Sequence, residues 1–455
     1  MSSSRRAGRA AAAALAIHLM TAAFAFGGVY VWSAAALSGS ALALLVGSRA
    51  RLPSSGALRT LDFGLIALLG AVLLQALPLP VEAIRVLSPG RDAFAAAMSL
   101  RPESPRTLSL SLGPRGTLHA WLSLFSIAAT FWAARAIFAR GGVRTCTTLV
   151  ACGAILLVLV AFAQHASGTQ LAYGFWQPRD AGARPLGPFI NRNHLGTWSI
   201  LAICLCVGYL QWRDVGVRPA RSWRGRVARL FESRRLILQL AVVLLASVIA
   251  LAASRAALVA LACSAGYVAV AGRGGARRSL AVVGVLALIA MLGYGDGRQL
   301  LRRVDETRAT GMTARLAIWR DALPVIRDFP VTGVGAGNFA TAMRLYQTTP
   351  RTYYHNEAHN QLLQIVVEGG ILLTVPAIVG IMALVAAARA RLRDREDPLA
   401  SMRTAAAAAL IGVTVQSLWE TGLTLPANGM FAAVLAGLLV HRPAAPLAEA
   451  RMEPR

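Results

Sequence analysis

The sequence Tyr353-Tyr-His-Asn-Glu-Ala-His-Asn-Gln-Leu-Leu-Gln-Ile-Val-Val-Glu-Gly-Gly370 lies where a polar, arginine-containing segment gives way to a long apolar run. The run continues to about residue 388, long enough for a helix to cross a hydrocarbon core about 30 Å thick. Two histidines and a glutamate occupy the last polar turn before it. This boundary predicts a membrane-spanning helix with titratable side chains at its entrance.

The composition of the whole chain is that of a membrane protein. Of its 455 residues 56% are hydrophobic and 15% are charged, with a mean hydropathy of +0.56, whereas soluble domains average about 25% charged residues. Apolar runs predict about twelve spans, at about 10–48 (two helices divided near Gly27-Gly28), 60–78, 117–138, 143–164, 194–212, 236–253, 256–272, 279–294, 359–388, 403–420 and 427–441. The predicted fold is an all-α, polytopic transmembrane bundle that forms one integral membrane domain over residues 1–455.

The net charge of +26 reflects membrane topology rather than nucleic-acid binding. All 46 basic residues are arginines, and most lie in short segments between apolar runs, including eight from Arg213 to Arg235. Positive loops are retained in the cytoplasm, so this distribution predicts that both termini are cytoplasmic. The loops 165–193 and 295–358, the break at Ser254-Arg255 and the entrance at His359 are then all extracytoplasmic. The five cysteines fall inside apolar runs and are interpreted as buried small residues.

Two polar breaks lie at the predicted extracytoplasmic ends of helices. Asn191, Arg192, Asn193 and His194 stand at a helix entry, where they could serve as an N-cap and a headgroup contact or bind substrate. Arg255 interrupts a nearly continuous apolar stretch. It either faces a cavity and an anion or lies in a hairpin turn among lipid headgroups.

The predicted extracytoplasmic loop 295–358 precedes the tenth span and contains amphipathic helical periodicity from Arg315 to Ile326. Further on, Gly333-Val-Gly-Ala-Gly337 has the glycine spacing of a nucleotide loop. No β-strand precedes it, so a dinucleotide site is rejected and a flexible turn is predicted.

His355 and His359 are four residues apart and flank Glu357, but the order differs from the His-Glu-x-x-His of zinc proteases and no third ligand is evident. We therefore predict no metal and no cofactor. His359, at the mouth of a span, is better suited to act as a general base. Arginines near it would neutralise an anionic leaving group such as a lipid-linked diphosphate.

Several of these segments resemble the O-antigen ligase/polymerase superfamily. They are Gly187-Pro-Phe-Ile-Asn-Arg-Asn-His194, Ser254-Arg255, Arg315-Leu-Ala-Ile-Trp319, Gly333-Val-Gly-Ala-Gly-Asn-Phe339, and His359-Asn360 followed by nine residues and Gly370. Ligases of the family carry His-[Asn/Ser/Gln]-x9-Gly-x-x-[Gly/Thr/Tyr]. This sequence has Leu373 at the last position and Thr374 one further on.

The resemblance implies a GT-C-like fold and metal-independent, inverting transfer of a glycan from an undecaprenyl-diphosphate-linked donor. By position, His359 resembles the catalytic histidine, and Arg255 and Arg315 resemble the diphosphate-binding arginines. His355, Glu357 and Asn360 are predicted to support them.

The resemblance also implies the bacterial inner membrane, with the site facing the periplasm. The implied acceptor is lipid A core for an O-antigen ligase, a growing glycan for a polymerase, or a protein hydroxyl for an O-oligosaccharyltransferase. The partners would be the lipid-linked glycan, that acceptor and membrane lipids, and no nucleic acid. A polysaccharide transporter is the alternative outside this class, because Arg255, Gln364 and Glu368 could line a pathway.

Overall fold

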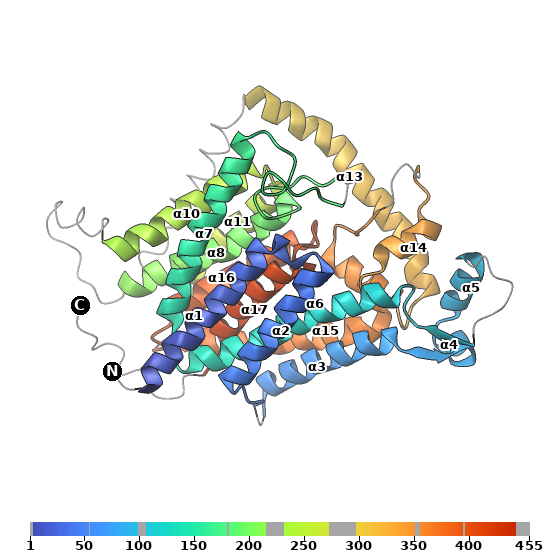
Figure 1. Cartoon of the computed structure of the whole chain (residues 1–455), viewed down its shortest axis with the longest axis horizontal. Helices are drawn as coiled ribbons and strands as arrows, with labels where there is room; N and C mark the ends of the chain where they lie inside the picture. Colours follow the sequence, from blue (N-terminus) through green and yellow to red (C-terminus); the bar gives the residue numbers. More distant parts are fainter. Residues whose placement is uncertain are drawn as a thin grey trace.

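The computed structural model describes residues 3–53, 55–98, 106–179, 182–214, 232–272, 297–350, 355–394 and 396–442, and it is dominated by long helices (Figure 1). The helices of the first half are α1 (Ser3–Phe24), η1 (Phe26–Gly28), α2 (Val31–Ser48), α3 (Ala57–Ala76), α4 (Val81–Leu87), α5 (Pro89–Met98), α6 (Pro114–Ala139), α7 (Val143–Ala166) and α8 (Arg192–Asp214). Those of the second half are α10 (Ser233–Leu251), α11 (Arg255–Ala271), α13 (Gly297–Asp328), α14 (Phe339–Tyr346), α15 (Gln361–Arg393), α16 (Ala400–Gln416), η2 (Gly422–Thr424) and α17 (Pro426–Val440).

Eight of the described helices are long and apolar enough to cross a membrane, namely α1, α2, α3, α6, α7, α8, α10 and α15. The helices α11 and α17 are apolar but shorter. The prediction of a polytopic helical membrane protein is thus confirmed. The predicted span at 279–294 lies outside the described residues, every other predicted span coincides with a described helix, and the count of about twelve stays a prediction.

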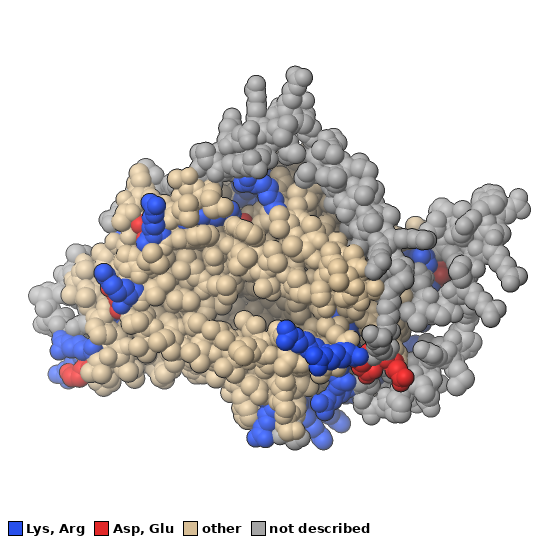
Figure 2. All heavy atoms as spheres, turned by 180° about the vertical axis from the view of Figure 1, so that it is seen from behind, with Lys and Arg blue, Asp and Glu red and all other residues tan. Residues whose placement is uncertain are grey.

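The surface of the bundle fits a lipid environment. Large apolar side chains point outward from several helices, among them Val46, Phe63 and Met382, which are more than half exposed. Figure 2 shows a broad face with few charged side chains, most of which lie toward its margins. Such a surface can be covered by acyl chains, while the charged margins meet water and headgroups.

The interior is held by small residues that let helices approach closely. A Cβ on Gly208 of α8 would lie 2.5 Å from the Cβ of Ala405 on α16, and one on Gly437 of α17 would lie 3.1 Å from the Cβ of Ala134 on α6. Close approach through Gly and Ala is the usual basis of helix packing in membranes. It makes α17 a central helix, buried along nearly its whole length between α6, α8 and α16.

The bundle has two distinct ends. At the terminal end, the start of α1 meets the start of α7, since a Cβ on Gly142 would lie 2.5 Å from the Cβ of Ala12, and the end of α6 meets the end of α17 through Phe138 and His441. At the opposite, distal end, the starts of α8, α11, α15 and α17 gather. The Gln361 N–H donates to the Ser417 carbonyl there (2.8 Å), and Gly422 packs against Thr197.

One small element departs from the predicted all-helical chain. Strands β1 (Pro78–Pro80) and β2 (Thr107–Ser109) pair antiparallel, with Pro78 opposite Ser109 and Pro80 opposite Thr107. The prolines look like breakers in the sequence, but a two-stranded ribbon tolerates a residue without an N–H at its edge.

The three glycines Gly333, Gly335 and Gly337 form a tightly packed turn, so the prediction of a flexible turn is wrong. All three have positive φ, and a Cβ on Gly333 would lie 2.4 Å from the backbone of Glu368. The turn docks where α15 is broken at Gly370, which has φ +52°.

Backbone hydrogen bonds complete this docking. The Val334 N–H donates to the Val367 carbonyl (3.0 Å), and the Ile371 N–H donates to the Pro330 carbonyl (3.0 Å). The turn therefore satisfies groups that the break in α15 would leave without partners. It belongs to a small apolar cluster with α13, α14 and the first part of α15.

Candidate active site

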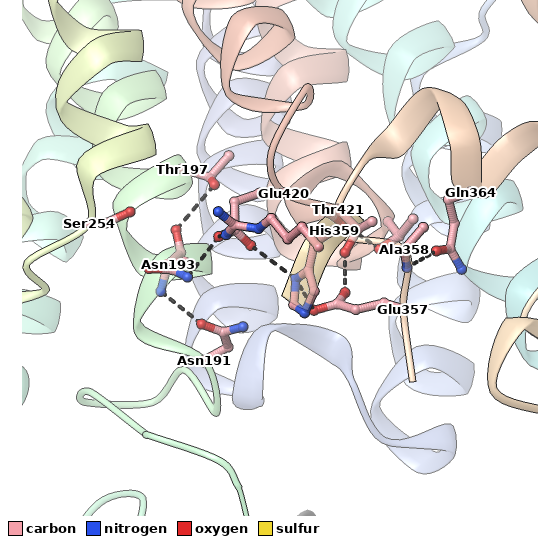
Figure 3. A network of polar contacts seen from close by, with 12 residues as sticks. Asn191, Asn193, Thr197, Ser254, Glu357, Ala358, His359, Gln364, Glu420 and Thr421 are labelled. Carbon is pink, nitrogen blue, oxygen red and sulfur yellow. Dashed lines mark hydrogen bonds and ion pairs between the residues drawn. The ribbon is translucent and has the colours of Figure 1, made fainter. Parts of the chain in front are cut away.

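Glu420 is the point at which four separate parts of the chain meet at the distal end of the bundle (Figure 3). It lies in the short connection between α16 and η2 and is 2% exposed. Its Oε1 accepts hydrogen bonds from Asn193 Nδ2 (2.9 Å) and Arg315 Nη2 (3.3 Å). Its Oε2 lies 3.8 Å from His359 Nδ1 and has no hydrogen-bond partner among the described residues.

The backbone holds His359 in an uncommon conformation. His359 has φ +49°, a left-handed value that costs free energy for a residue with a Cβ. The preceding peptide group is fixed on both sides, because the Ala358 N–H donates to Gln364 Oε1 (2.7 Å) and the Ala358 carbonyl accepts from Trp319 Nε1 (2.9 Å). The following residue, Asn360, caps α15 by accepting from the Leu363 N–H (3.0 Å).

A second layer supports this arrangement. Gln364 Nε2 donates to Glu368 Oε1 (2.6 Å), and Glu368 accepts from the backbone N–H groups of Gly337 (2.9 Å) and Phe339 (3.3 Å). Gln364 and Glu368 thus join α15 to the glycine turn. Asn360 and Gln364 fix the backbone on either side of His359.

Two carboxylates dominate the electrostatics of His359. Its Nδ1 lies 3.3 Å from Glu357 Oε1 and 3.8 Å from Glu420 Oε2, within ion-pair distance but without the alignment of a hydrogen bond. Burial alone would lower the pKa of His359. The carboxylates of Glu420 and Glu357 outweigh burial and the opposing charge of Arg315, so the pKa is raised above its usual value.

The carboxylates also raise the question of a metal. His194, Glu357 and Glu420 each offer one atom, and these atoms lie within 4.8 Å of one another, a spacing that a cation could bridge. The carboxylates already have other partners, since Glu420 accepts from Asn193 and Arg315 and Glu357 accepts from the Thr421 hydroxyl. We therefore assign no metal here.

Asn191 and Asn193 have different roles at the start of α8. Asn191 Oδ1 accepts from the Asn193 N–H (2.9 Å), which is the capping role weighed in the sequence analysis. Asn193 instead reaches Glu420. The carbonyl of His194 accepts from Asn428 Nδ2 (3.0 Å). The ring Nε2 of His194 is buried without a hydrogen-bond partner among the described groups. The N–H of Arg192 pairs with the Arg184 carbonyl (3.2 Å).

Arg255 is the first residue of α11 and lies at the same end of the bundle. Ser254 caps this helix by accepting from the Ala257 N–H (3.4 Å). Ala257 packs against α8, since a Cβ on Gly196 would lie 3.0 Å from its Cβ. Arg255 is exposed, and no ion pair ties it to Glu420 within the described part of the chain. Its guanidinium therefore flanks the site rather than joining the network.

His355 belongs to different surroundings from His359. It is 7% exposed, its N–H donates to Gln347 Oε1 (3.0 Å), and its Nε2 lies 3.2 Å from the Thr349 hydroxyl. Burial lowers its pKa. The contacts of His355 tie it to the residues after α14, so it anchors the incoming chain, whereas Glu357 is the neighbour that contacts His359.

Sequence reasoning missed Glu420 and Thr421, and it named Trp319 only as the last residue of a motif. Glu420 stands between two predicted spans in Ser417-Leu-Trp-Glu-Thr421. An ionisable residue at such a place is by default a candidate for function. The sequence therefore indicates that Glu420 is a candidate, but it does not indicate which residues Glu420 contacts.

Comparison with known protein families finds a match over the middle of the chain. Residues 240–378 match the family model described as O-antigen ligase. This region contains Arg255, Arg315 and His359, together with the glycine turn and the break at Gly370. None of the curated proteins compared matches the chain. The helical membrane fold and this match together support membership of the O-antigen ligase superfamily.

Proposed function

We propose that the protein transfers a glycan from an undecaprenyl-diphosphate-linked donor to an acceptor hydroxyl on the periplasmic face, as an O-antigen ligase. The observation that supports this most is the convergence of Arg315, Asn193 and His359 on one buried carboxylate, Glu420. Superfamily membership supports the reaction class. The distal end offers cations for a diphosphate and a histidine for a hydroxyl, which is what this transfer needs.

His359 would act as the general base. Its Nδ1 faces the two carboxylates, so the Nδ1–H tautomer is favoured and Nε2 keeps a lone pair, as in a Ser-His-Asp triad. The side chain is 31% exposed, which leaves the ring accessible. Nε2 would accept the proton of the acceptor hydroxyl as its oxygen attacks the anomeric carbon.

The arginines would stabilise the leaving group. As the bond from the acceptor oxygen to the anomeric carbon forms, the bond from that carbon to the phosphate oxygen breaks on the opposite face, which inverts the anomeric centre. Undecaprenyl diphosphate leaves with the bonding electrons. Arg315, whose side chain is 24% exposed, and Arg255 would compensate its negative charge, and the step needs no metal.

The arginine distribution supports the orientation of the protein in the inner membrane. The cluster that begins at Arg213 follows the end of α8, which lies opposite the start of that helix and hence at the terminal end. Positive segments are retained in the cytoplasm. We therefore infer that the terminal end, with both chain termini, is cytoplasmic and that the distal end faces the periplasm.

A polymerase and a protein O-oligosaccharyltransferase would use the same site with another acceptor. The departure of Leu373 from the ligase motif lies away from His359, because Leu373 is buried against Ala71, Val72 and Ala336. The transporter alternative is less favoured, because the polar groups gather at one end of the bundle and not along a path across it.

The envelope glycans of a deletion strain test the proposal. Loss of all attached glycan with accumulation of lipid-linked polymer supports a ligase, whereas loss of long polymer with single repeats still attached indicates a polymerase. Loss restricted to protein-linked glycan indicates an O-oligosaccharyltransferase. The wild-type gene is expected to restore the glycan, and Arg315→Ala to leave it lost at equal membrane abundance. An unchanged glycan profile in the deletion strain would contradict the whole proposal.

A further inference from the structure

We propose that Glu420 is the positioning residue of this site, one carboxylate that orients Asn193 and Arg315 through Oε1 and His359 through Oε2. The inference rests on the proposed function and adds to it a residue that no sequence motif contains. Three different elements supply the groups it contacts: the start of α8, the α13 helix and the segment before α15.

The two oxygens of Glu420 are used differently. Oε1 is saturated by the amide of Asn193 and the guanidinium of Arg315. Oε2 is buried, lacks a hydrogen-bond partner and lies 3.8 Å from His359 Nδ1, which lacks one as well. A buried carboxylate oxygen normally has its hydrogen bonds made. Glu420 Oε2 and His359 Nδ1 can therefore form a hydrogen bond when the imidazole rotates to meet a substrate hydroxyl.

The groups around His359 make Glu420 the stronger of its two carboxylate partners. Glu357, from the same segment, is nearer at 3.3 Å, but its side chain is 21% exposed, whereas that of Glu420 is 3% exposed. Solvent screens an exposed charge more than a buried one. Arg315 from α13 opposes protonation of His359, and His194 of α8 lies near both carboxylates.

This geometry gives Glu420 a specific effect on catalysis. A base that must be neutral to act loses activity as pH falls through its pKa, which produces an acid limb in the profile of kcat against pH. Because the carboxylates raise the pKa of His359, the acid limb of the wild-type protein lies at a higher pH than the usual pKa of histidine. Removing the charge of Glu420 lowers the pKa and moves the limb to lower pH.

The test uses the full-length protein in proteoliposomes with a purified undecaprenyl-diphosphate glycan donor and a defined acceptor. Glu420→Gln keeps the shape and one acceptor oxygen but removes the charge. We expect kcat at neutral pH to fall about 100-fold, with the acid limb displaced to lower pH. Glu420→Asp is expected to move the limb in the same direction by less and to recover part of the rate.

Two matched substitutions define the specificity of the effect. Glu357→Gln removes the partly exposed carboxylate and is expected to give a smaller displacement of the limb than Glu420→Gln. Glu396→Gln removes an exposed carboxylate near the end of α15, at the terminal end, and is expected to leave the profile unchanged. If Glu420→Gln does not accumulate in the membrane, Glu420→Asp provides the same test.

The inference and the proposed function fail in different ways. An acid limb that stays in place in both Glu420 variants, or that moves more in Glu357→Gln, overturns the role of Glu420. Retained transfer in His359→Ala overturns the catalytic role of His359 itself, whatever the Glu420 variants show. An inactive His359→Ala together with an unmoved limb in Glu420→Gln leaves the proposed function intact and removes only the inference.

Discussion

The buried ion pair of Asp62 and Arg135 at the terminal end and the network around Glu420 at the distal end differ in how completely their hydrogen bonds are made. At the terminal end, Asp62 accepts two bonds from Arg135 (2.8 and 2.7 Å) and one from Trp132 Nε1 (2.9 Å). At the distal end, Glu420 leaves one oxygen open, and Arg315 and His359 are partly exposed. The first cluster is closed and the second is open.

Arg403 shows the same closed pattern as Arg135. It is 0% exposed, pairs with Asp397 (2.6 Å) and donates to the carbonyls of Leu438, Leu439 and His441 at the end of α17. A cation at a helix C-terminus stabilises the helix dipole and its free carbonyls. Burial and charge therefore do not mark a functional site by themselves. The distal network differs in that Glu420 Oε2 lacks a hydrogen-bond partner among the described residues and lies beside the partly exposed His359.

The largest effect is expected for His359→Ala in the open cluster. Loss of a general base lowers the rate of transfer by about 10³-fold, while the abundance and thermal stability of the protein stay the same because the removed side chain is partly exposed. Transfer of labelled glycan in proteoliposomes measures the rate, and immunoblotting of membranes measures the abundance. Retained transfer would contradict the role of His359.

For Asp62→Ala, in the closed cluster, we expect the abundance of the protein to change and not its rate of transfer. The substitution leaves the guanidinium of Arg135 buried without its partner, which costs about 3–5 kcal/mol. Membrane abundance is expected to drop, while the rate per folded molecule stays at the wild-type level. The double substitution Asp62→Leu with Arg135→Met removes both charges and is expected to restore abundance. A normal level of Asp62→Ala protein would show that this pair does not stabilise the fold.

A smaller effect is expected for Trp319→Phe, which removes the hydrogen bond to the Ala358 carbonyl but keeps an aromatic ring. Such a bond contributes about 1 kcal/mol, so kcat is expected to fall about fivefold. Trp121→Phe is the matched control, because Trp121 Nε1 donates to the Leu69 carbonyl (3.0 Å) between α6 and α3. It is expected to cost similar stability without changing kcat. Equal kcat values for the two variants would show that the hydrogen bond from Trp319 to the Ala358 carbonyl does not help to position His359.

The smallest effect is expected on removal of metal ions. Arg315 already compensates part of the charge of Glu420, and Glu357 accepts from the Thr421 hydroxyl, so treatment with a strong chelator is expected to leave the transfer rate unchanged. The rate is measured before and after chelation and again after addition of divalent cations. A loss that one cation restores would show that His194, Glu357 and Glu420 hold a metal.

The sequence predicts the helices well because each apolar run is long and its ends are marked. It also predicts that polar segments far apart in the chain gather at one end, since this follows from alternating spans. It does not predict the packed glycine turn, because the docking of Gly333 on α15 depends on a break that no periodicity indicates. The sequence also does not predict the ribbon of β1 and β2, because its prolines are typical of chain breaks rather than of strands.

The candidate site is predictable only in part. The motifs single out His359, Arg255 and Arg315, but not Glu420, which joins His359 to Arg315. Glu420 is separated from Arg315 by 105 positions and from Asn193 by 227. A single sequence contains no information on such pairings until the helices are packed. His355 and Glu357 show the same limit, because both stand close to His359 in sequence and only the fold shows that Glu357 contacts it.

The break of α15 at Gly370 has a consequence for chimeric proteins. The first part of this helix is bonded to the glycine turn and to α13, and the remainder packs against α3. The described residues from Arg315 to Gly370 therefore share many hydrogen bonds, but they also depend on partners outside the segment, because Gln75 donates to the Thr332 and Glu368 carbonyls and Arg315 donates to Glu420. Recombinants between relatives that exchange this segment whole would keep the hydrogen bonds within it, whereas a crossover inside it would separate Glu368 from the glycines it binds. A transplant of this segment alone would therefore also need a carboxylate at the position of Glu420 to orient Arg315 and His359.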